Sequence, residues 1–180
     1  WDGTAWNQLG SDIDGEDEGD RSGHAISLSN NGTTVAIGAY KHDADKGHTR
    51  IYDWDGNAWV QRGTDIDGEA AVDASGRSVS LSGDGNTVAI GASHNDGNSG
   101  QTNHNSGHTR IYDWNGTDWV QRGSDIDGER ALDHSSSPGL SLSDDGNTVA
   151  IGSIYNDNNG NVDAGHTRIY DWNGTDWVQR

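Results

Sequence analysis

The strongest constraint on this chain is an internal repeat. The phrase Gly-His-Thr-Arg-Ile-Tyr-Asp-Trp occurs at residues 47–54, 107–114 and 165–172. A second phrase, Asp-Ile-Asp-Gly-Glu, occurs at residues 12–16, 65–69 and 125–129. Self-similarity over a period of tens of residues is typical of propellers, solenoids and other repeat architectures. Any fold of this chain must therefore be built from near-identical units.

These phrases divide the chain into three full copies preceded by a fragment. Residues 1–9 duplicate the last strand of a preceding copy, and the full copies cover residues 10–62, 63–122 and 123–180. A propeller needs about four to eight blades to close, so three are too few. We therefore expect the remaining partners to be further repeats of a longer chain or other copies of this one.

Each copy predicts four β-strands. In the second copy they cover residues 76–82, 87–92, 108–114 and 118–122, which are rich in Val, Ile, Tyr, Trp and Thr. Asn-Gly or Asp-Gly pairs follow the first and third strands, and they predict two-residue hairpin turns with positive φ at both positions. The predicted fold class is all-β, with tandem four-stranded antiparallel blades of a propeller-like kind. A solenoid of stacked β-units is the alternative.

The copies differ mainly in one loop. The segments between the second and third strands are residues 40–46, 93–106 and 154–164, and they vary in length and content. Surface loops tolerate such insertions. A lectin with one site per blade needs similar binding residues in every copy, so this variation favours a structural role.

Charge and composition exclude several classes of partner. The chain carries a formal net charge of −18 and contains no Cys, Phe or Met. Such charge at low hydrophobicity is typical of disorder, but the apolar residues here are gathered in short blocks, as in folded β-proteins. An acidic surface repels phosphate backbones and anionic lipids, and no apolar run approaches about 18 residues. We expect no nucleic-acid partner and no membrane insertion.

The second copy carries a family resemblance. Residues 75–82 read Ser-Gly-Arg-Ser-Val-Ser-Leu-Ser and residues 84–92 read Asp-Gly-Asn-Thr-Val-Ala-Ile-Gly-Ala. This pattern, present in all three copies, resembles the FG-GAP family of β-propeller repeats. The resemblance implies a blade of a secreted or cell-surface protein, as in the head of integrin α-chains. The chain departs from the family pattern in two ways. The family's calcium loop is shortened, and its Phe-Gly is replaced by Ser22-Gly23, Ser75-Gly76 and Ser137-Pro138-Gly139.

The acidic linkers between copies are the best candidate metal site. Ca²⁺ takes about six to eight oxygen ligands from closely spaced carboxylates and carbonyls in Gly-containing loops. Asp-x-Asp-Gly-Glu resembles the start of such a loop, and Ca²⁺ is therefore the candidate cofactor. The alternative is that these carboxylates cap turns by accepting backbone N–H bonds. The candidate ligands are Asp12, Asp14, Glu16, Asp20, Asp65, Asp67, Glu69, Asp73, Asp125, Asp127, Glu129 and Asp133.

Other repeated polar residues favour local roles. Each copy has a His and an Arg in the third strand, such as His108 and Arg110. We expect the His to hydrogen-bond locally and the Arg to pair with a carboxylate, such as the following Asp113, or to stack on Trp. Four histidines that do not recur in every copy are expected to face solvent: His42, His94, His104 and His134.

Two features of the sequence could involve carbohydrate: the tryptophans, which could stack on sugars, and the Asn-Gly-Thr sequences, which could carry N-linked glycans. Trp rings can stack on sugars, but a chain without Phe or Met needs Trp to fill its core. The candidate stacking residues, under that alternative interpretation, are Trp6, Trp59, Trp119 and Trp177. The candidate N-glycosylation sites are Asn31, Asn115 and Asn173, each on a predicted turn.

The function predicted from the sequence is non-enzymatic. The sequence has no nucleophile elbow, phosphate loop or His-Glu-x-x-His motif, and carboxylates identical in every repeat lack the asymmetry of an active site. We predict a structural repeat segment of an extracellular filament, appendage or surface assembly. The alternative is a propeller adhesin or lectin that binds glycans, with Ca²⁺ as its candidate ion. Either function places the protein outside the cell or on its surface.

Overall fold

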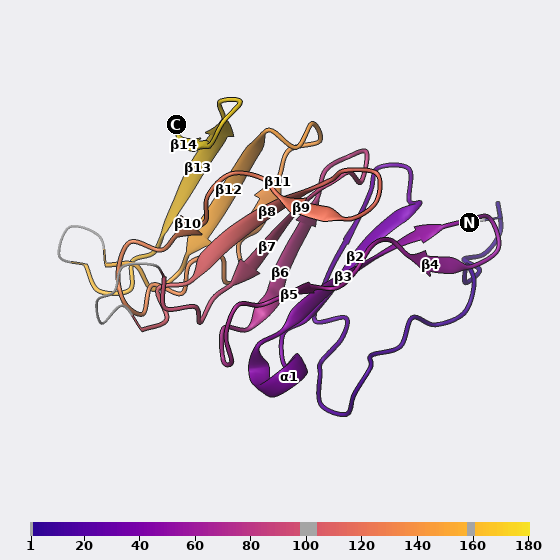
Figure 1. Cartoon of the computed structure of the whole chain (residues 1–180), viewed down its shortest axis with the longest axis horizontal. Helices are drawn as coiled ribbons and strands as arrows, with labels where there is room; N and C mark the ends of the chain where they lie inside the picture. Colours follow the sequence, from indigo (N-terminus) through magenta and orange to yellow (C-terminus); the bar gives the residue numbers. More distant parts are fainter. Residues whose placement is uncertain (1, 98–103, 158–160) are drawn as a thin grey trace.

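The predicted all-β architecture is confirmed. The computed structural model describes residues 2–97, 104–157 and 161–180, so Trp1 and parts of two variable loops lie outside the described residues. Three antiparallel sheets, one for each repeat, follow one another like neighbouring blades (Figure 1). Among the described residues the one helix is α1 (His42–Asp45), a single turn in a segment that the sequence predicts as a loop.

The strands lie close to the predicted positions. The first sheet contains β1 (Ala25–Leu28), β2 (Thr34–Ala39), β3 (His48–Trp54), β4 (Trp59–Gln61) and β5 (Ile66–Asp67). The second contains β6 (Ser75–Leu81), β7 (Thr87–Ala92), β8 (His108–Trp114), β9 (Trp119–Gln121) and β10 (Ile126–Asp127). The third contains β11 (Leu140–Leu142), β12 (Thr148–Ser153), β13 (His166–Trp172) and β14 (Trp177–Gln179).

Two short strands, β5 and β10, connect consecutive repeats. β3 pairs with β4 along its last residues and with β5 at its start, where His48 is opposite Asp67. β8 pairs with β9 and β10 in the same way. β5 and β10 belong to the Asp-Ile-Asp-Gly-Glu linkers, so the opening residues of a repeat complete the sheet before it. Within the described part of the third sheet, β13 has no strand equivalent to β5.

The hairpin turns differ from the predicted two-residue type. In the turn after β3, Trp54 is opposite Trp59, so four residues form the loop. Gly56 has φ of +101°, whereas Asp55 does not have positive φ. The Asp55 carboxylate instead accepts a hydrogen bond from the Ala58 N–H at 2.8 Å. The expectation of positive φ at both positions was wrong, because the Asx side chain satisfies the turn and only glycine adopts the left-handed conformation.

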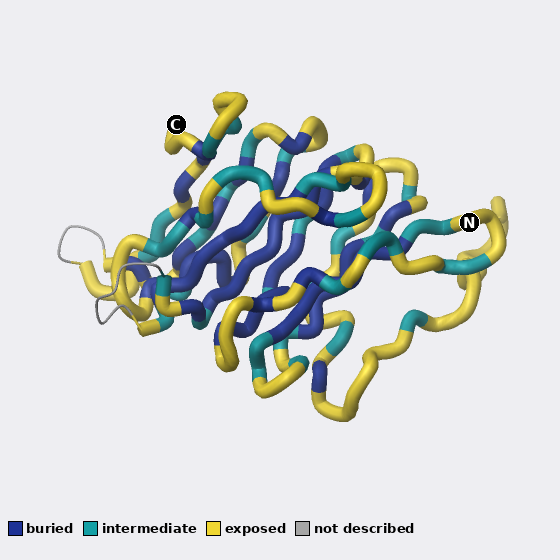
Figure 2. The backbone as a smooth tube through the Cα atoms, in the orientation of Figure 1, coloured by how far each residue is buried: buried dark blue, intermediate teal, exposed yellow. Residues whose placement is uncertain are grey.

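The hydrophobic core lies between the sheets. One cluster joins the first sheet and β5 to the second, and contains Ala36, Ile51, Ile66, Val79, Leu81, Val88, Ile90, Tyr112 and Trp119. The other joins the second sheet and β10 to the third, and contains Ala89, Ile111, Ile126, Leu142, Val149, Ile151, Tyr170 and Trp177. Figure 2 shows the buried backbone in the central strands, with the exposed segments at the loops and both outer ends. Each repeat therefore depends on its neighbours for burial.

Candidate functional sites

The last carboxylate of each linker caps a turn. Asp20, Asp73 and Asp133 are all buried. Each accepts a backbone N–H from the residue three positions earlier, at 3.0 Å. Asp73 also accepts a hydrogen bond from Asn95 Nδ2 at 2.9 Å. These contacts match the turn-capping role that the sequence offered as the alternative to calcium.

The first two acidic positions of each linker accept hydrogen bonds from a glutamine and an arginine. Asp12, Asp65 and Asp125 accept hydrogen bonds from the amides of Gln8, Gln61 and Gln121. The backbone carbonyls of Asp14, Asp67 and Asp127 accept hydrogen bonds from Arg50, Arg110 and Arg168 at 2.7–2.8 Å. Every linker is therefore fixed along the third strand of a repeat by the same contacts.

The repeated arginine contacts this linker instead of the aspartate predicted for it. Arg110 Nη1 lies 3.6 Å from Glu69 Oε1, and its other terminal nitrogen donates to the Asp67 carbonyl. Asp113 accepts a hydrogen bond from Thr87 Oγ1 at 2.7 Å. The expected pairing of Arg110 with a carboxylate is made with Glu69. The pairing with Asp113 was wrong, because successive residues of a strand point to opposite faces of a sheet and these two residues are three positions apart.

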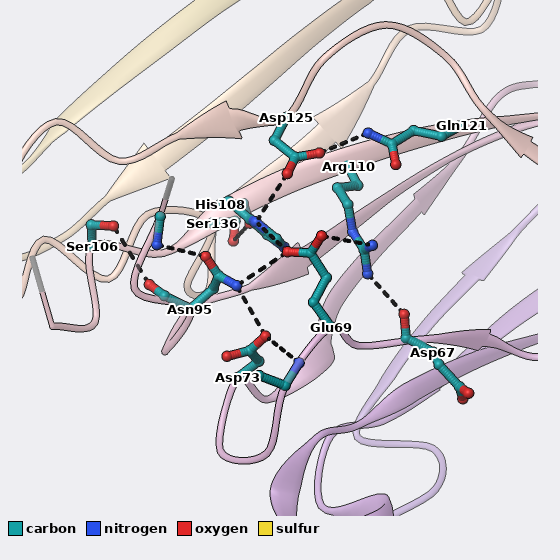
Figure 3. Close-up of polar contacts among 12 residues, drawn as sticks. Asp67, Glu69, Asp73, Asn95, Ser106, His108, Arg110, Gln121, Asp125 and Ser136 are labelled. Carbon is teal, nitrogen blue, oxygen red and sulfur yellow. Dashed lines mark hydrogen bonds and ion pairs between the residues drawn. The ribbon is translucent and has the colours of Figure 1, made fainter. Parts of the chain in front are cut away.

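The third acidic position meets a buried histidine. His108 Nδ1 lies 3.8 Å from Glu69 Oε2 and 3.8 Å from Asp125 Oδ2 (Figure 3). Burial lowers the pKa of His108 to about 4, and the charge of Arg110 adds to the shift. The imidazole is therefore neutral at pH 7. Ligand atoms of these three residues lie within 4.8 Å of one another, a mixed nitrogen and oxygen set that could hold a divalent cation.

The same two histidine–carboxylate contacts recur in the first repeat, and one of them recurs in the third. His48 Nδ1 lies 3.8 Å from both Glu16 Oε2 and Asp65 Oδ2. His166 Nδ1 lies 3.7 Å from Glu129 Oε2, and no second carboxylate of the described residues pairs with it. The structure thus brings together carboxylates from two successive linkers around one histidine. Calcium binding by the four carboxylates of a single linker stays a prediction.

Three of the four candidate sugar-stacking tryptophans hold neighbouring repeats together. The indole N–H groups of Trp59, Trp119 and Trp177 donate to backbone carbonyls of Leu9, Arg62 and Arg122 at 2.8–3.0 Å. Trp119 and Trp177 are buried in the two cores, so protein covers their rings. Trp6 is exposed. The candidate glycosylation sites Asn31, Asn115 and Asn173 are exposed on turns.

The innermost strands are joined by serine hydrogen bonds that repeat from one interface to the next. Ser27 Oγ in β1 accepts the Leu81 N–H of β6 at 2.9 Å. Ser80 Oγ in β6 accepts the Leu142 N–H of β11 at 2.9 Å. The two interfaces are therefore built in the same register.

An arginine at the end of the fourth strand forms a second repeated link. Arg122 donates to the Gly146 carbonyl at 2.9 Å and to Asn147 Oδ1 at 2.6 Å, and its guanidinium lies 4.5 Å from the centroid of the Trp172 ring. Arg62 makes the equivalent contacts to the second repeat. Arg180, at the same position of the third repeat, pairs with Asp171.

A cavity of about 710 Å³ lies where the innermost strands begin, and residues of all three repeats line it. His94 and His134, which the sequence places in solvent, are half-buried in its wall, with ring centroids 5.0 Å apart. Arg77 of β6 also lines it. Motif analysis missed these residues because they lie at positions where the repeats differ, and that variation is the available signal.

Comparisons with known proteins show similarity in fold alone. No family model and no curated protein matches the sequence. The chain is similar in structure to a candidate 6-phosphogluconolactonase from Bacteroides uniformis, with a TM-score of 0.56 and 13% identity, covering 87% of this chain and 39% of that one. It is also similar to hydrazine synthase from Kuenenia stuttgartiensis, with a TM-score of 0.50 and 13% identity, covering 81% and 39%. The chain thus spans about two fifths of either structure. Within the described ranges, no helix is long and apolar enough to cross a membrane.

Proposed function

We propose that this chain is a non-enzymatic structural segment that joins head to tail with repeats of its own kind in an extracellular filament, appendage or surface assembly. One observation carries the proposal. Two internal interfaces use equivalent residues in the same register, and the two outer faces present those same residues uncovered. The resemblance to FG-GAP repeats and the lack of catalytic motifs support the same function.

The outer face of the first sheet presents apolar side chains. In β1, Ile26 is 69% exposed and Leu28 is 57% exposed. Their equivalents in β6, Val79 and Leu81, are 8% and 6% exposed because the first sheet covers them. An uncovered apolar face of this kind marks an interaction surface.

The outer face of the third sheet presents the complementary half. Ile169 in β13 is 39% exposed, whereas its equivalents Ile51 and Ile111 are 1% and 0% exposed. Ser141, the equivalent of Ser27 and Ser80, is exposed. This face therefore matches the face of the second sheet that receives the third.

A second copy can bind the outer face of the third sheet through contacts equivalent to those at the internal interfaces. Its Leu28 N–H is expected to donate to Ser141 Oγ, as Leu142 does to Ser80. Its Ile13 is expected to extend β13 as Ile66 extends β3. A contact that joins two different faces of one molecule gives a ring if the rotation closes and a filament if it does not.

The test disrupts one outer face at a time. Leu28→Asp places a charge on the outer face of the first sheet, and Ile169→Asp places one on the outer face of the third sheet. As a control, Val120→Asp adds the same charge at an exposed site on β9. We expect size-exclusion chromatography with light scattering to show multimers for the unmodified chain and V120D, and monomers for L28D and I169D alone. An equimolar mixture of L28D and I169D should form dimers, since each retains one complementary face.

Electron microscopy then separates the two candidate functions. Continuous fibres with a regular axial repeat support the structural segment. Discrete closed discs favour the propeller adhesin or lectin, for which the shared cavity offers a binding site. A monomeric unmodified chain at high concentration, or an L28D and I169D mixture without dimers, contradicts head-to-tail assembly.

A further inference from the structure

The cavity shared by the three repeats is built from residues that do not repeat. The residue two positions before Ile26, Val79 and Leu140 in the innermost strands is His24, Arg77 and Pro138 in the three copies. All three line the cavity. The interfaces between repeats use identical residues, whereas this position differs in charge and shape in every copy. The cavity is therefore an asymmetric site in an otherwise repetitive molecule.

Aromatic rings contact the residues that line the cavity. The His24 and Tyr40 ring centroids are 4.5 Å apart, and the Arg77 guanidinium lies 5.2 Å from the centroid of Tyr40. On the other side, the His134 and Tyr155 centroids are 5.4 Å apart. Such contacts hold the side chains that surround Arg77 and give the wall flat ring surfaces.

Arg77 supplies an uncompensated positive charge. Arg62 and Arg122, which join the repeats, pair with Asp53 and Asp113. Arg77, in contrast, forms no ion pair within the described ranges. Burial, and then the charge of Arg77, lower the pKa of His94 and His134, so both imidazoles are neutral hydrogen-bonding groups at neutral pH. Among the described lining residues, Asp163 is the acidic one, and it is exposed. In a chain of net charge −18, this arrangement selects for an anion.

The size and lining of the cavity narrow the ligand further. A volume of about 710 Å³ lies within the range of small-molecule sites and exceeds the needs of an inorganic anion. Leu132, Ile154 and Tyr155 add apolar surface beside the polar groups. We propose that the cavity binds an acidic sugar of one or two rings, with its carboxylate on Arg77 and its ring against Tyr155. A planar guanidinium pairs with a carboxylate through two parallel hydrogen bonds.

This inference goes beyond the proposed structural role, and its test is independent of assembly. Glucuronate is titrated into the L28D variant, which is expected to be monomeric and is altered outside the cavity lining. Binding is followed by NMR chemical shifts, with glucose as the neutral ring and inorganic phosphate as the ringless anion. We expect saturable shifts from glucuronate at residues of the cavity, and at least tenfold weaker binding of glucose and phosphate.

Substitution of the arginine completes the test. Arg77→Gln keeps a long side chain over Tyr40 and removes the charge, so glucuronate affinity should fall at least tenfold while the fold is retained. Arg180→Ala removes one positive charge next to β14, at the outer edge of the third sheet. This variant should leave the glucuronate affinity unchanged. Absence of glucuronate binding, equal binding of glucose or phosphate, or unchanged affinity in R77Q would each overturn the proposal.

Discussion

Strands β8 and β13 have the same seven residues but different surroundings. Ile111 in β8 is fully buried, whereas Ile169 at the same position of β13 is 39% exposed. Thr109 is buried and Thr167 is exposed. The second sheet is covered on both faces and the third on one (Figure 1). Since sequence and strand geometry are shared, the difference comes entirely from the neighbouring repeat.

The comparison shows that burial of the strand residues in this molecule depends on the interfaces between repeats. In a repeat array each unit contacts only its neighbours, and the total stability is close to a sum of unit and interface contributions. Matched substitutions in the covered second sheet and the half-covered third sheet can measure the interface contribution directly, because the local sequence stays constant.

The largest difference is expected for the strand isoleucines. Ile111→Ala should lower the free energy of unfolding by about 2–5 kcal/mol, because it leaves a cavity in a packed core. Ile169→Ala should cost about 1 kcal/mol or less, because the side chain is partly in solvent. Urea unfolding followed by Trp fluorescence, at a protein concentration that keeps the chain monomeric, measures both. Equal losses would mean that the neighbouring sheet contributes nothing to the burial of Ile111.

A smaller difference is expected for the strand glycines. A methyl group on Gly38 of β2 would overlap the carbonyl oxygen of Gly76 in the next sheet. A methyl group on the equivalent Gly152 of β12 would lie 3.4 Å from its nearest neighbour, the Cα of Gly139. Gly38→Ala should therefore destabilise the chain by about 1–3 kcal/mol through overpacking. Gly152→Ala should have little effect in the same urea experiment, and a larger loss in G152A than in G38A would refute this account.

The third pair compares the arginines at the ends of the fourth strands. Arg122→Ala removes two hydrogen bonds to the third repeat and the stacking on Trp172, and should cost about 1–2 kcal/mol. Arg180→Ala removes an exposed ion pair with Asp171, which should leave the thermal midpoint of the monomer unchanged. Differential scanning fluorimetry of both variants provides the measurement. A matching drop in R180A would show that the surface pair, and not the link between sheets, provides the stabilisation.

The repeat made most of the fold predictable. The strands of the second copy lie within a residue or two of the predicted ranges, because Thr-Val-Ala-Ile-Gly and His-Thr-Arg-Ile-Tyr are dense in strand-forming residues. β5 and β10 were missed, since two residues with flanking aspartates carry no strand periodicity. They pair only because the preceding sheet offers them an edge.

The candidate sites were less predictable for a geometric reason. The turn-capping role of Asp73 is local and was foreseen as an alternative. The grouping of Glu69, His108 and Asp125 joins two linkers to one strand, and only the sheet register reveals it. The cavity around Arg77 depends on the ends of three repeats meeting. Sequence patterns identify what is repeated, whereas that cavity is made from the positions that are not.

The smallest difference is expected for the serines of the innermost strands. β11 forms the edge of its sheet, and its Leu142 N–H donates to Ser80 Oγ of β6 in the neighbouring sheet instead of to a strand of its own sheet. Ser80→Ala leaves that N–H unpaired and should cost about 1 kcal/mol, with faster hydrogen exchange at Leu142. Ser141→Ala should change neither quantity in the monomer, because no N–H of the described residues donates to it. If the third face receives a second copy in the proposed register, S141A should instead weaken assembly, and equal assembly of S141A and the unmodified chain would place the contact elsewhere.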